Sequence, residues 1–317
     1  MHELVRYRRL GDGELEVSEI GLGSWLTYGD AVARDQARRC LDAAFDCGIN
    51  FVDTANVLAG GRAEECLGDI LHSRRRETYV LSTKVYFDMP DGDRGLSAAQ
   101  IHKQLDASLV RLRTDHVDLY MCHAYDLEVP LEETLEALTS VVRAGKVRQV
   151  GVSNWTGGQI RKAAALVRKR SFARIVSSQP EYSLLRRAPE RGIIPASAAS
   201  GISQIAWSPL AQGVLTGKYV PGEAFADGTR ARARSNTFMS RYLTRSVLTR
   251  VQRLRPLAER LGISTAQLSL AWVLHQPTVA SATVGATSPE QVRENAAASE
   301  VDLDAATLAA IEAAIAT

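Results

Sequence analysis

The chain has 317 residues, of which 45% are hydrophobic and 23% are charged, and its formal net charge at pH 7 is +2. This composition is that of an ordinary globular protein with a large core, and the near balance of charge gives no overall argument for nucleic-acid binding. No signal-peptide pattern occurs and no apolar run approaches the roughly 20 residues of a membrane span, so we expect a cytoplasmic protein without membrane contact.

The cysteines and histidines give no sign of a disulfide framework or a metal site. The four cysteines lack CxxC spacing, so they are expected as small buried side chains or as free thiols of a reducing compartment. The six histidines show no metal-ligand spacing, and no metal is expected.

The chain begins with a predicted hairpin and a strand that ends in glycines. Residues 5–10 and 15–17 flank Gly11-Asp12-Gly13, which is typical of a β-hairpin. The strand 19–25 has a Gly-x-Gly sequence, but Leu26 stands where a dinucleotide-binding fingerprint has its third glycine. A Rossmann fold is therefore disfavoured.

From there on, strands and helices alternate. The expected strands are short, nearly continuous apolar runs, as in parallel strands buried on both faces: 19–25, 50–53, 78–84, 116–123, 147–152, 175–177, 202–207 and 282–284. Apolar residues at helical spacing predict helices over 34–47, 63–71, 97–111, 131–144, 156–168, 188–200, 246–261, 264–275, 290–298 and 304–315, with a long loop over 211–243. Eight strand–helix units predict an α/β fold, a (β/α)8 TIM barrel with an N-terminal β-hairpin, as a single domain over residues 1–317.

Three chemically active residues end consecutive predicted strands: Asp53, Lys84 and His123. Because the C-terminal ends of barrel strands meet at one mouth, we expect these side chains to converge. An ammonium held by a carboxylate lowers the pKa of a neighbouring hydroxyl, and an imidazole hydrogen-bonds a substrate oxygen. The set therefore predicts an apparatus that polarises a carbonyl and protonates its oxygen. For Asp53 alone, a helix cap or a turn residue is the alternative.

Several longer stretches follow one another along nearly the whole chain, from about Tyr7 to about Ala297. They are Gly21-Leu-Gly-Ser-Trp25, Asp53-Thr-Ala-Asn-Val, Ser82-Thr-Lys84, Val117-Asp-Leu-Tyr with His123, Gly145-Lys-Val-Arg, Gly151-Val-Ser-Asn-Trp155, Trp207-Ser-Pro-Leu210, Gly217-Lys-Tyr219 and Gly285-Ala-Thr with Gln291 and Glu294-Asn295. In this set and order, the sequence resembles the aldo-keto reductase superfamily, and more closely the branch with the potassium-channel β subunits and related bacterial reductases.

The resemblance implies NADPH-dependent reduction of an aldehyde or ketone by hydride transfer. It places Asp53, Lys84 and His123 in the catalytic tetrad and assigns cofactor binding to Ser153, Asn154, Gln179, Trp207, Ser208, Pro209, Leu210, Gln212, Gly213, Gly217, Lys218, Arg230, Gly285, Thr287, Gln291, Glu294 and Asn295. Within this set, Lys218 and Arg230 match basic positions near the phosphates, including the ribose 2′-phosphate, and this favours NADP over NAD.

The fourth tetrad member of the resembled family is a tyrosine five residues after the aspartate, and here that position is Leu58. Neither Tyr28 nor Tyr86 matches the position. Because leucine has no proton to give, the resemblance leaves three readings open. The chain is a reductase with altered proton donation, an NADP(H)-binding barrel with a non-redox or regulatory role, or an engineered inactive variant of an ordinary reductase.

The substrate and the assembly are less determined by the sequence. The candidates for the substrate pocket are Trp25, Tyr28, Leu58, Tyr86, Phe87, Tyr125 and Trp155. A run of arginines over 229–258 without acidic residues is interpreted as a solvated face and a lid over an anionic cofactor; a nucleic-acid patch or an anionic substrate are the alternatives. The resembled branch often forms tetramers or larger rings, so a homo-oligomer is one expectation, acting on a small carbonyl compound.

Overall fold

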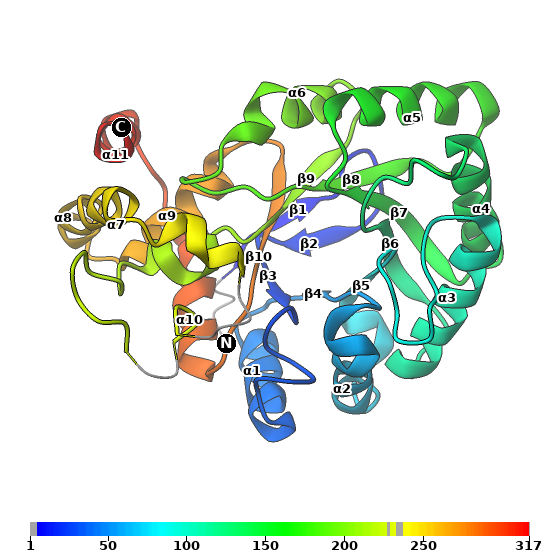
Figure 1. Ribbon diagram of the computed structural model, residues 1–317, viewed down its shortest axis with the longest axis horizontal. Helices are drawn as coiled ribbons and strands as arrows, with labels where there is room; N and C mark the ends of the chain where they lie inside the picture. Colours follow the sequence, from blue (N-terminus) through cyan, green and yellow to red (C-terminus); the bar gives the residue numbers. More distant parts are fainter. Residues whose placement is uncertain (1–4, 227–228, 233–236, 317) are drawn as a thin grey trace.

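The protein folds into a closed barrel of eight parallel strands with helices around it, as the computed structural model shows for residues 5–226, 229–232 and 237–316 (Figure 1). The strands in sequence order are β3 (Ile20–Gly23), β4 (Phe51–Asp53), β5 (Val80–Val85), β6 (Val117–Cys122), β7 (Val147–Ser153), β8 (Ile175–Gln179), β9 (Ser203–Trp207) and β10 (Val279–Val284). Each strand pairs with the next, and β10 also pairs with β3. The predicted (β/α)8 barrel is confirmed. Arg234 of the arginine run lies outside the described residues.

An antiparallel hairpin of β1 (Tyr7–Arg9) and β2 (Glu16–Ser18) precedes the barrel, as predicted. Its buried residues Leu10, Leu15 and Val17 form one apolar cluster with side chains of the barrel interior. The turn needs glycine at position 11, where φ is +52° and a Cβ atom would come within 2.3 Å of the Gly201 carbonyl oxygen. The hairpin thus closes the N-terminal end of the barrel.

Helices cover the outside of the strands. They are α1 (Arg34–Asp46), α2 (Arg62–Leu71), α3 (Ala98–Leu112), α4 (Leu131–Arg143), α5 (Gly157–Arg170), α6 (Ile193–Ala198), α7 (Arg245–Gln252), α8 (Arg255–Arg260), α9 (Thr265–His275), α10 (Pro289–Ala296) and α11 (Ala305–Ile315). Short 3-10 turns add η1 (Leu58–Gly61), η2 (Arg76–Thr78), η3 (Ala188–Arg191), η4 (Ala211–Thr216), η5 (Thr237–Tyr242) and η6 (Ala297–Glu300). Within the described chain, no helix is long and apolar enough to cross a membrane.

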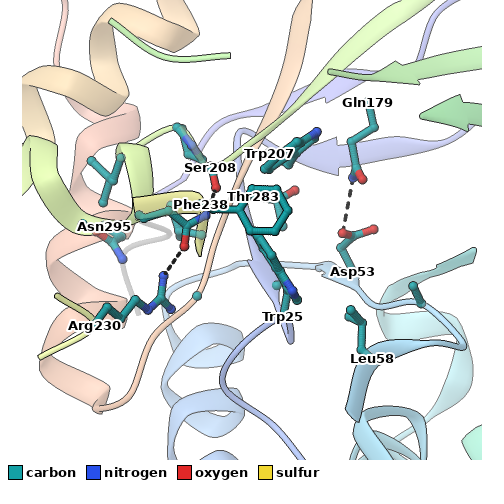
Figure 2. A pocket seen from close by; sticks show the side chains of 18 of the residues that line it. Trp25, Asp53, Leu58, Gln179, Trp207, Ser208, Arg230, Phe238, Thr283 and Asn295 are labelled. Atoms are coloured by element: carbon teal, nitrogen blue, oxygen red, sulfur yellow. Dashed lines mark hydrogen bonds between the residues drawn. The ribbon is translucent and has the colours of Figure 1, made fainter. Parts of the chain in front are cut away.

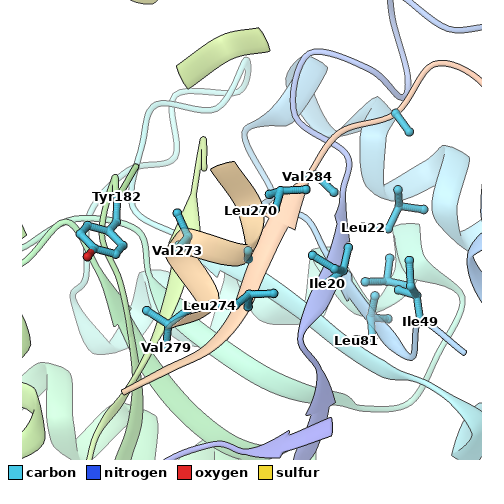
Figure 3. Packing of buried hydrophobic residues seen from close by; sticks show 14 of the residues in the cluster. Ile20, Leu22, Ile49, Leu81, Tyr182, Leu270, Val273, Leu274, Val279 and Val284 are labelled. Carbon is cyan, nitrogen blue, oxygen red and sulfur yellow. The ribbon is translucent and has the colours of Figure 1, made fainter. Parts of the chain in front are cut away.

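The main core lies between the strands and these helices (Figure 3). Leu270, Val273 and Leu274 of α9 pack with strand residues such as Ile20 and Val279, all nearly fully buried. Burial of this apolar surface, worth about 25 cal/mol per Å², is the main stabilising term and holds the strand ends in fixed positions.

Three predicted segments differ from the structure. The helix predicted over 246–261 is two helices, α7 and α8, because Pro256 in the first turn of α8 has no N–H for the helical ladder. The helix predicted over 188–200 is η3 followed by α6, with non-helical backbone at Gly192. The stretch predicted as a loop over 211–243 contains η4 and η5.

Candidate active site

A buried ion pair lies where β4 and β5 end. The Lys84 Nζ atom is 2.8 Å from Asp53 Oδ1, 2.8 Å from Asp53 Oδ2 and 2.7 Å from the Thr54 carbonyl oxygen. Asp53 also accepts hydrogen bonds from the Ser82 hydroxyl and, at 3.3 Å, from Gln179 Nε2 (Figure 2). Burial lowers the pKa of Lys84, and the charge and hydrogen bonds of Asp53 oppose this shift.

The third predicted catalytic residue, His123, follows β6 and lies next to the pair. Its burial, and secondly the charge of Lys84, lower its pKa to about 3, so the imidazole is neutral at neutral pH. The Nδ1 atom is buried without a partner among the described residues. An unpaired buried acceptor is less costly than an unpaired buried N–H, which favours the tautomer with the proton on Nε2.

Leu58 begins the turn η1, five residues after Asp53. The turn bends sharply, with positive φ at Ala59, Gly60 and Gly61, and then leads into α2. Figure 2 shows the Leu58 side chain close to Asp53, on the wall of the same pocket. An aliphatic group thus lies at the barrel mouth beside the ion pair.

A cavity of about 840 Å³ opens at this end of the barrel. It is lined by Asp53, Leu58, Lys84 and His123, and by every residue predicted to bind the cofactor except Gly217. Gly217 instead ends η4 with a φ of +78°, and its carbonyl oxygen accepts a hydrogen bond from Gln252. The structure therefore brings the predicted catalytic and cofactor residues to one cavity.

Hydrogen bonds order the polar groups of the cavity wall at the C-terminal ends of β7 and β9. Trp207 Nε1 donates to Asn154 Oδ1 at 3.1 Å, and Asn154 Nδ2 donates to the His123 carbonyl oxygen and to Ser153 Oγ, both at 3.1 Å. Asn154 takes a left-handed backbone conformation with a φ of +58°. These contacts fix amide and hydroxyl groups close to the ion pair.

Two cations lie on another part of the cavity wall, Lys218 after η4 and Arg230. Desolvation lowers the pKa of both, and the charge of Arg230 further lowers that of Lys218. Arg230 Nη1 makes a long contact of 3.4 Å with Gln212 Oε1, and neither cation pairs with a carboxylate among the described residues. Two neighbouring, partly desolvated cations without a counter-ion form a site that favours an anion.

The wall formed by α10 carries Gln291, Glu294 and Asn295. Gln291 Oε1 accepts a hydrogen bond from the backbone N–H of Thr287 at 2.9 Å. Gly285 lies near this wall, and a Cβ atom at that position would come within 3.3 Å of the Arg230 guanidinium.

Aromatic rings form much of the remaining wall. Trp25 lies edge-on to Trp207 and Phe238, with ring centroids 5.7 and 5.3 Å apart (Figure 2). Phe87 contacts the ring of His123 with centroids 4.8 Å apart. Phe238, on η5, was not predicted, because its segment has no periodic pattern.

Four residues predicted for the substrate pocket, Tyr28, Tyr86, Tyr125 and Trp155, are not among the side chains that line this cavity. Tyr28 is buried in the core, with 2% of its surface exposed. Trp155 is also buried, and Tyr125 packs against it with centroids 4.8 Å apart. Tyr86 contacts Phe87 from the side. Tyr28 and Trp155 belong to the core, and the half-buried Tyr86 and Tyr125 pack against it.

Comparison with known proteins decides the family. The aldo/keto reductase family model matches residues 19–316. The chain belongs to the aldo/keto reductase family. It is 38% identical over 301 residues to a probable voltage-gated potassium channel subunit beta of Oryza sativa subsp. japonica, covering 94% of this chain and 92% of the relative. It is 37% identical over 312 residues to the uncharacterized oxidoreductase YrpG of Bacillus subtilis, covering 95% and 93%.

These matches confirm the resemblance seen in the sequence. The family and the relative named as an oxidoreductase support an oxidoreductase, and aldo/keto reductases generally use NAD(P)H. No group of three or more metal-ligand side chains occurs among the residues for which the structure is described.

Proposed function

We propose that this aldo/keto reductase transfers hydride between NADP(H) and an aldehyde or ketone, with proton donation weakened by Leu58. One observation carries the proposal: a single cavity joins the buried Asp53–Lys84 pair and the neutral His123 to the two cations Lys218 and Arg230. Reaction chemistry and anion binding are thereby brought within one space.

The cavity residues fit the phosphorylated dinucleotide. Lys218 and Arg230, which have no carboxylate partner in the described chain, suit phosphate groups, including a ribose 2′-phosphate, and this supports NADP over NAD. Ser153, Asn154 and Gln179 offer hydroxyl and amide groups to the nicotinamide carboxamide. When bound, the cofactor supplies or accepts a hydride.

At the reacting end, the side chains polarise the substrate more than they protonate it. The Nε2–H group of His123 is a neutral donor for a carbonyl oxygen, and the Asp53–Lys84 pair supplies a fixed dipole beside it. Leu58 offers no hydroxyl, so the proton for the product oxygen comes from His123 or from water. Loss of a positioned general acid slows a reaction by roughly 10²–10⁴-fold.

The relatives' names support a second candidate, a barrel that binds NADP(H) without turnover and acts on a partner. Two plant relatives, from Oryza sativa subsp. japonica and Arabidopsis thaliana, are named probable voltage-gated potassium channel subunits beta. Leu58 is consistent with a barrel that binds the cofactor without turnover, whether the leucine is natural or an engineered replacement. For both candidate functions we propose a cytoplasmic protein that forms a homo-oligomer. Light scattering, which measures the molar mass in solution, tests the oligomer.

Cofactor titration and turnover assays separate the candidates. Protein fluorescence measured against NADPH and NADH is expected to show tighter binding of NADPH. NADPH absorbance is then followed with a panel of aldehydes and ketones, for this chain and for Leu58→Tyr. Slow turnover by this chain and faster turnover by the tyrosine variant support the reductase. Tight NADPH binding without turnover by either protein supports the non-redox role.

A further inference from the structure

The groups near Asp53 are poor sources of a proton. The three N–H groups of the Lys84 ammonium already have acceptors, the two carboxylate oxygens of Asp53 and the Thr54 carbonyl oxygen, at 2.7–2.8 Å. With 3% of its surface exposed, Lys84 has no further N–H to direct at a substrate.

His123 offers one further N–H group at this end, but a neutral imidazole is a very weak acid, because loss of that proton leaves an imidazolate anion. Among the described lining residues there is no tyrosine and no cysteine. The carboxylate of Asp53 is engaged by Lys84, while Glu294 lies on α10, on the part of the wall that also carries Gln291 and Asn295. The Thr283 hydroxyl is buried and unpaired, but an aliphatic hydroxyl is a far weaker acid than a phenol.

The same region suits a positively charged group. Leu58, Phe87, Trp25, Trp207 and Phe238 form an apolar, largely aromatic wall. A cation near such ring faces gains about 0.5–2 kcal/mol from the ring quadrupole. The charge of Lys84 is offset by Asp53 at 2.8 Å, so a cationic substrate meets a neutral pair rather than a free ammonium.

We propose that the preferred hydride acceptor at this site is an iminium ion, a cationic carbon–nitrogen double bond, held against this aromatic wall. The inference rests on the proposed NADP(H)-dependent reductase and names its substrate class. Hydride bonds to the iminium carbon, and the π electron pair of the C=N bond becomes the lone pair of a neutral amine. The iminium is reduced, NADPH is oxidised to NADP⁺, and no proton is transferred.

A neutral carbonyl places a different demand on the site. Hydride addition to it leaves an alkoxide, which needs a proton or strong stabilisation. Leu58 provides neither. Reduction of an iminium ion needs no proton, so the missing hydroxyl does not slow that reaction. Leucine at position 58 thus favours iminium ions over neutral carbonyl compounds as hydride acceptors.

The test compares a permanently charged iminium with a neutral carbonyl. N-methyl-3,4-dihydroisoquinolinium and benzaldehyde are assayed with NADPH, after subtraction of the rate without protein, for this chain, for Leu58→Tyr and for the size-matched Leu58→Phe. We expect this chain to show a kcat/KM at least tenfold higher for the iminium. That preference falls at least tenfold in the tyrosine variant and not in the phenylalanine variant. The iminium rate stays constant between about pH 6 and 9.

Each other outcome counts against a specific claim. Equal or faster reduction of benzaldehyde by this chain overturns the iminium preference and leaves the carbonyl reductase in place. The same loss of preference in the tyrosine and phenylalanine variants shows that size, and not the hydroxyl, decides, and it also overturns the inference. Reduction of neither compound by any of the three proteins, with NADPH bound, overturns both the inference and the proposed reductase.

Discussion

The Lys84 ammonium lies 2.8 Å from both carboxylate oxygens of Asp53, and both side chains are at least nine-tenths buried. The parallel register of β4 and β5 brings the two residues to the same end of the barrel. Removing two charges from water is costly, and only their close contact and further hydrogen bonds offset that cost. The fold therefore maintains a neutral but strongly polar pair at the cavity floor.

Asp53→Asn is expected to destabilise the protein by about 3 kcal/mol, because it leaves the buried Lys84 without its carboxylate. Urea unfolding without cofactor measures this change. The matched control is Asp106→Asn, which breaks a half-exposed surface pair with Lys146 and is expected to have a far smaller effect. Equal losses of stability in the two variants contradict the buried-pair account.

Acid stability tests the environment of His123. Its pKa in the native state is about 3, whereas in the unfolded chain it is near 6.5. As pH falls below 6.5, the unfolded state takes up a proton that the native state does not. Stability is therefore lost toward acid by about 1.4 kcal/mol per pH unit, or about 2 kcal/mol between pH 7 and 5. The His123→Asn variant is expected not to show this loss of stability. The same dependence of unfolding free energy on pH in both proteins would exclude His123 as its source.

Lys218 and Arg230 are expected to determine the cofactor preference. Replacement of either residue by alanine removes a charge-assisted contact, so the Kd for NADPH rises at least tenfold while that for NADH changes less. Lys162→Ala, at an exposed position on α5, is the control and leaves both constants unchanged. Equal weakening of NADPH and NADH binding contradicts recognition of the 2′-phosphate by these cations.

Substitution of two aromatic residues separates the cavity wall from the core. Trp25→Leu removes a ring from the wall and is expected to raise KM for an aromatic substrate several-fold. Tyr28→Phe changes a buried ring outside the wall and is expected to leave kcat/KM within about twofold. Steady-state kinetics of the two variants test this difference. A larger loss of kcat/KM in Tyr28→Phe than in Trp25→Leu would disprove the assignment of Trp25 to the cavity wall and of Tyr28 to the core.

The sequence predicts the barrel and the convergence of Asp53, Lys84 and His123, because parallel strands bring their C-terminal ends to one mouth. It does not show which way a side chain near that mouth points. Trp25 and Tyr28 are close neighbours in the sequence, yet one lines the cavity and the other is buried.

Contacts between residues that lie far apart in the chain also leave no signal in local sequence patterns. The hydrogen bond from Gln179 to Asp53 joins residues 126 positions apart. Phe238 reaches the cavity from a stretch without periodic spacing. By contrast, the break between α7 and α8 follows from Pro256, which is visible in the sequence.

The most direct test of the central claim is the single-turnover rate of aldehyde reduction with saturating NADPH, measured for this chain and for Leu58→Tyr. If the missing hydroxyl limits proton transfer, the tyrosine variant is faster by roughly 10²–10⁴-fold. Leu58→Phe controls for side-chain size and is expected to remain slow. Equal rates for this chain and the tyrosine variant would contradict the account, because proton donation would then not depend on position 58.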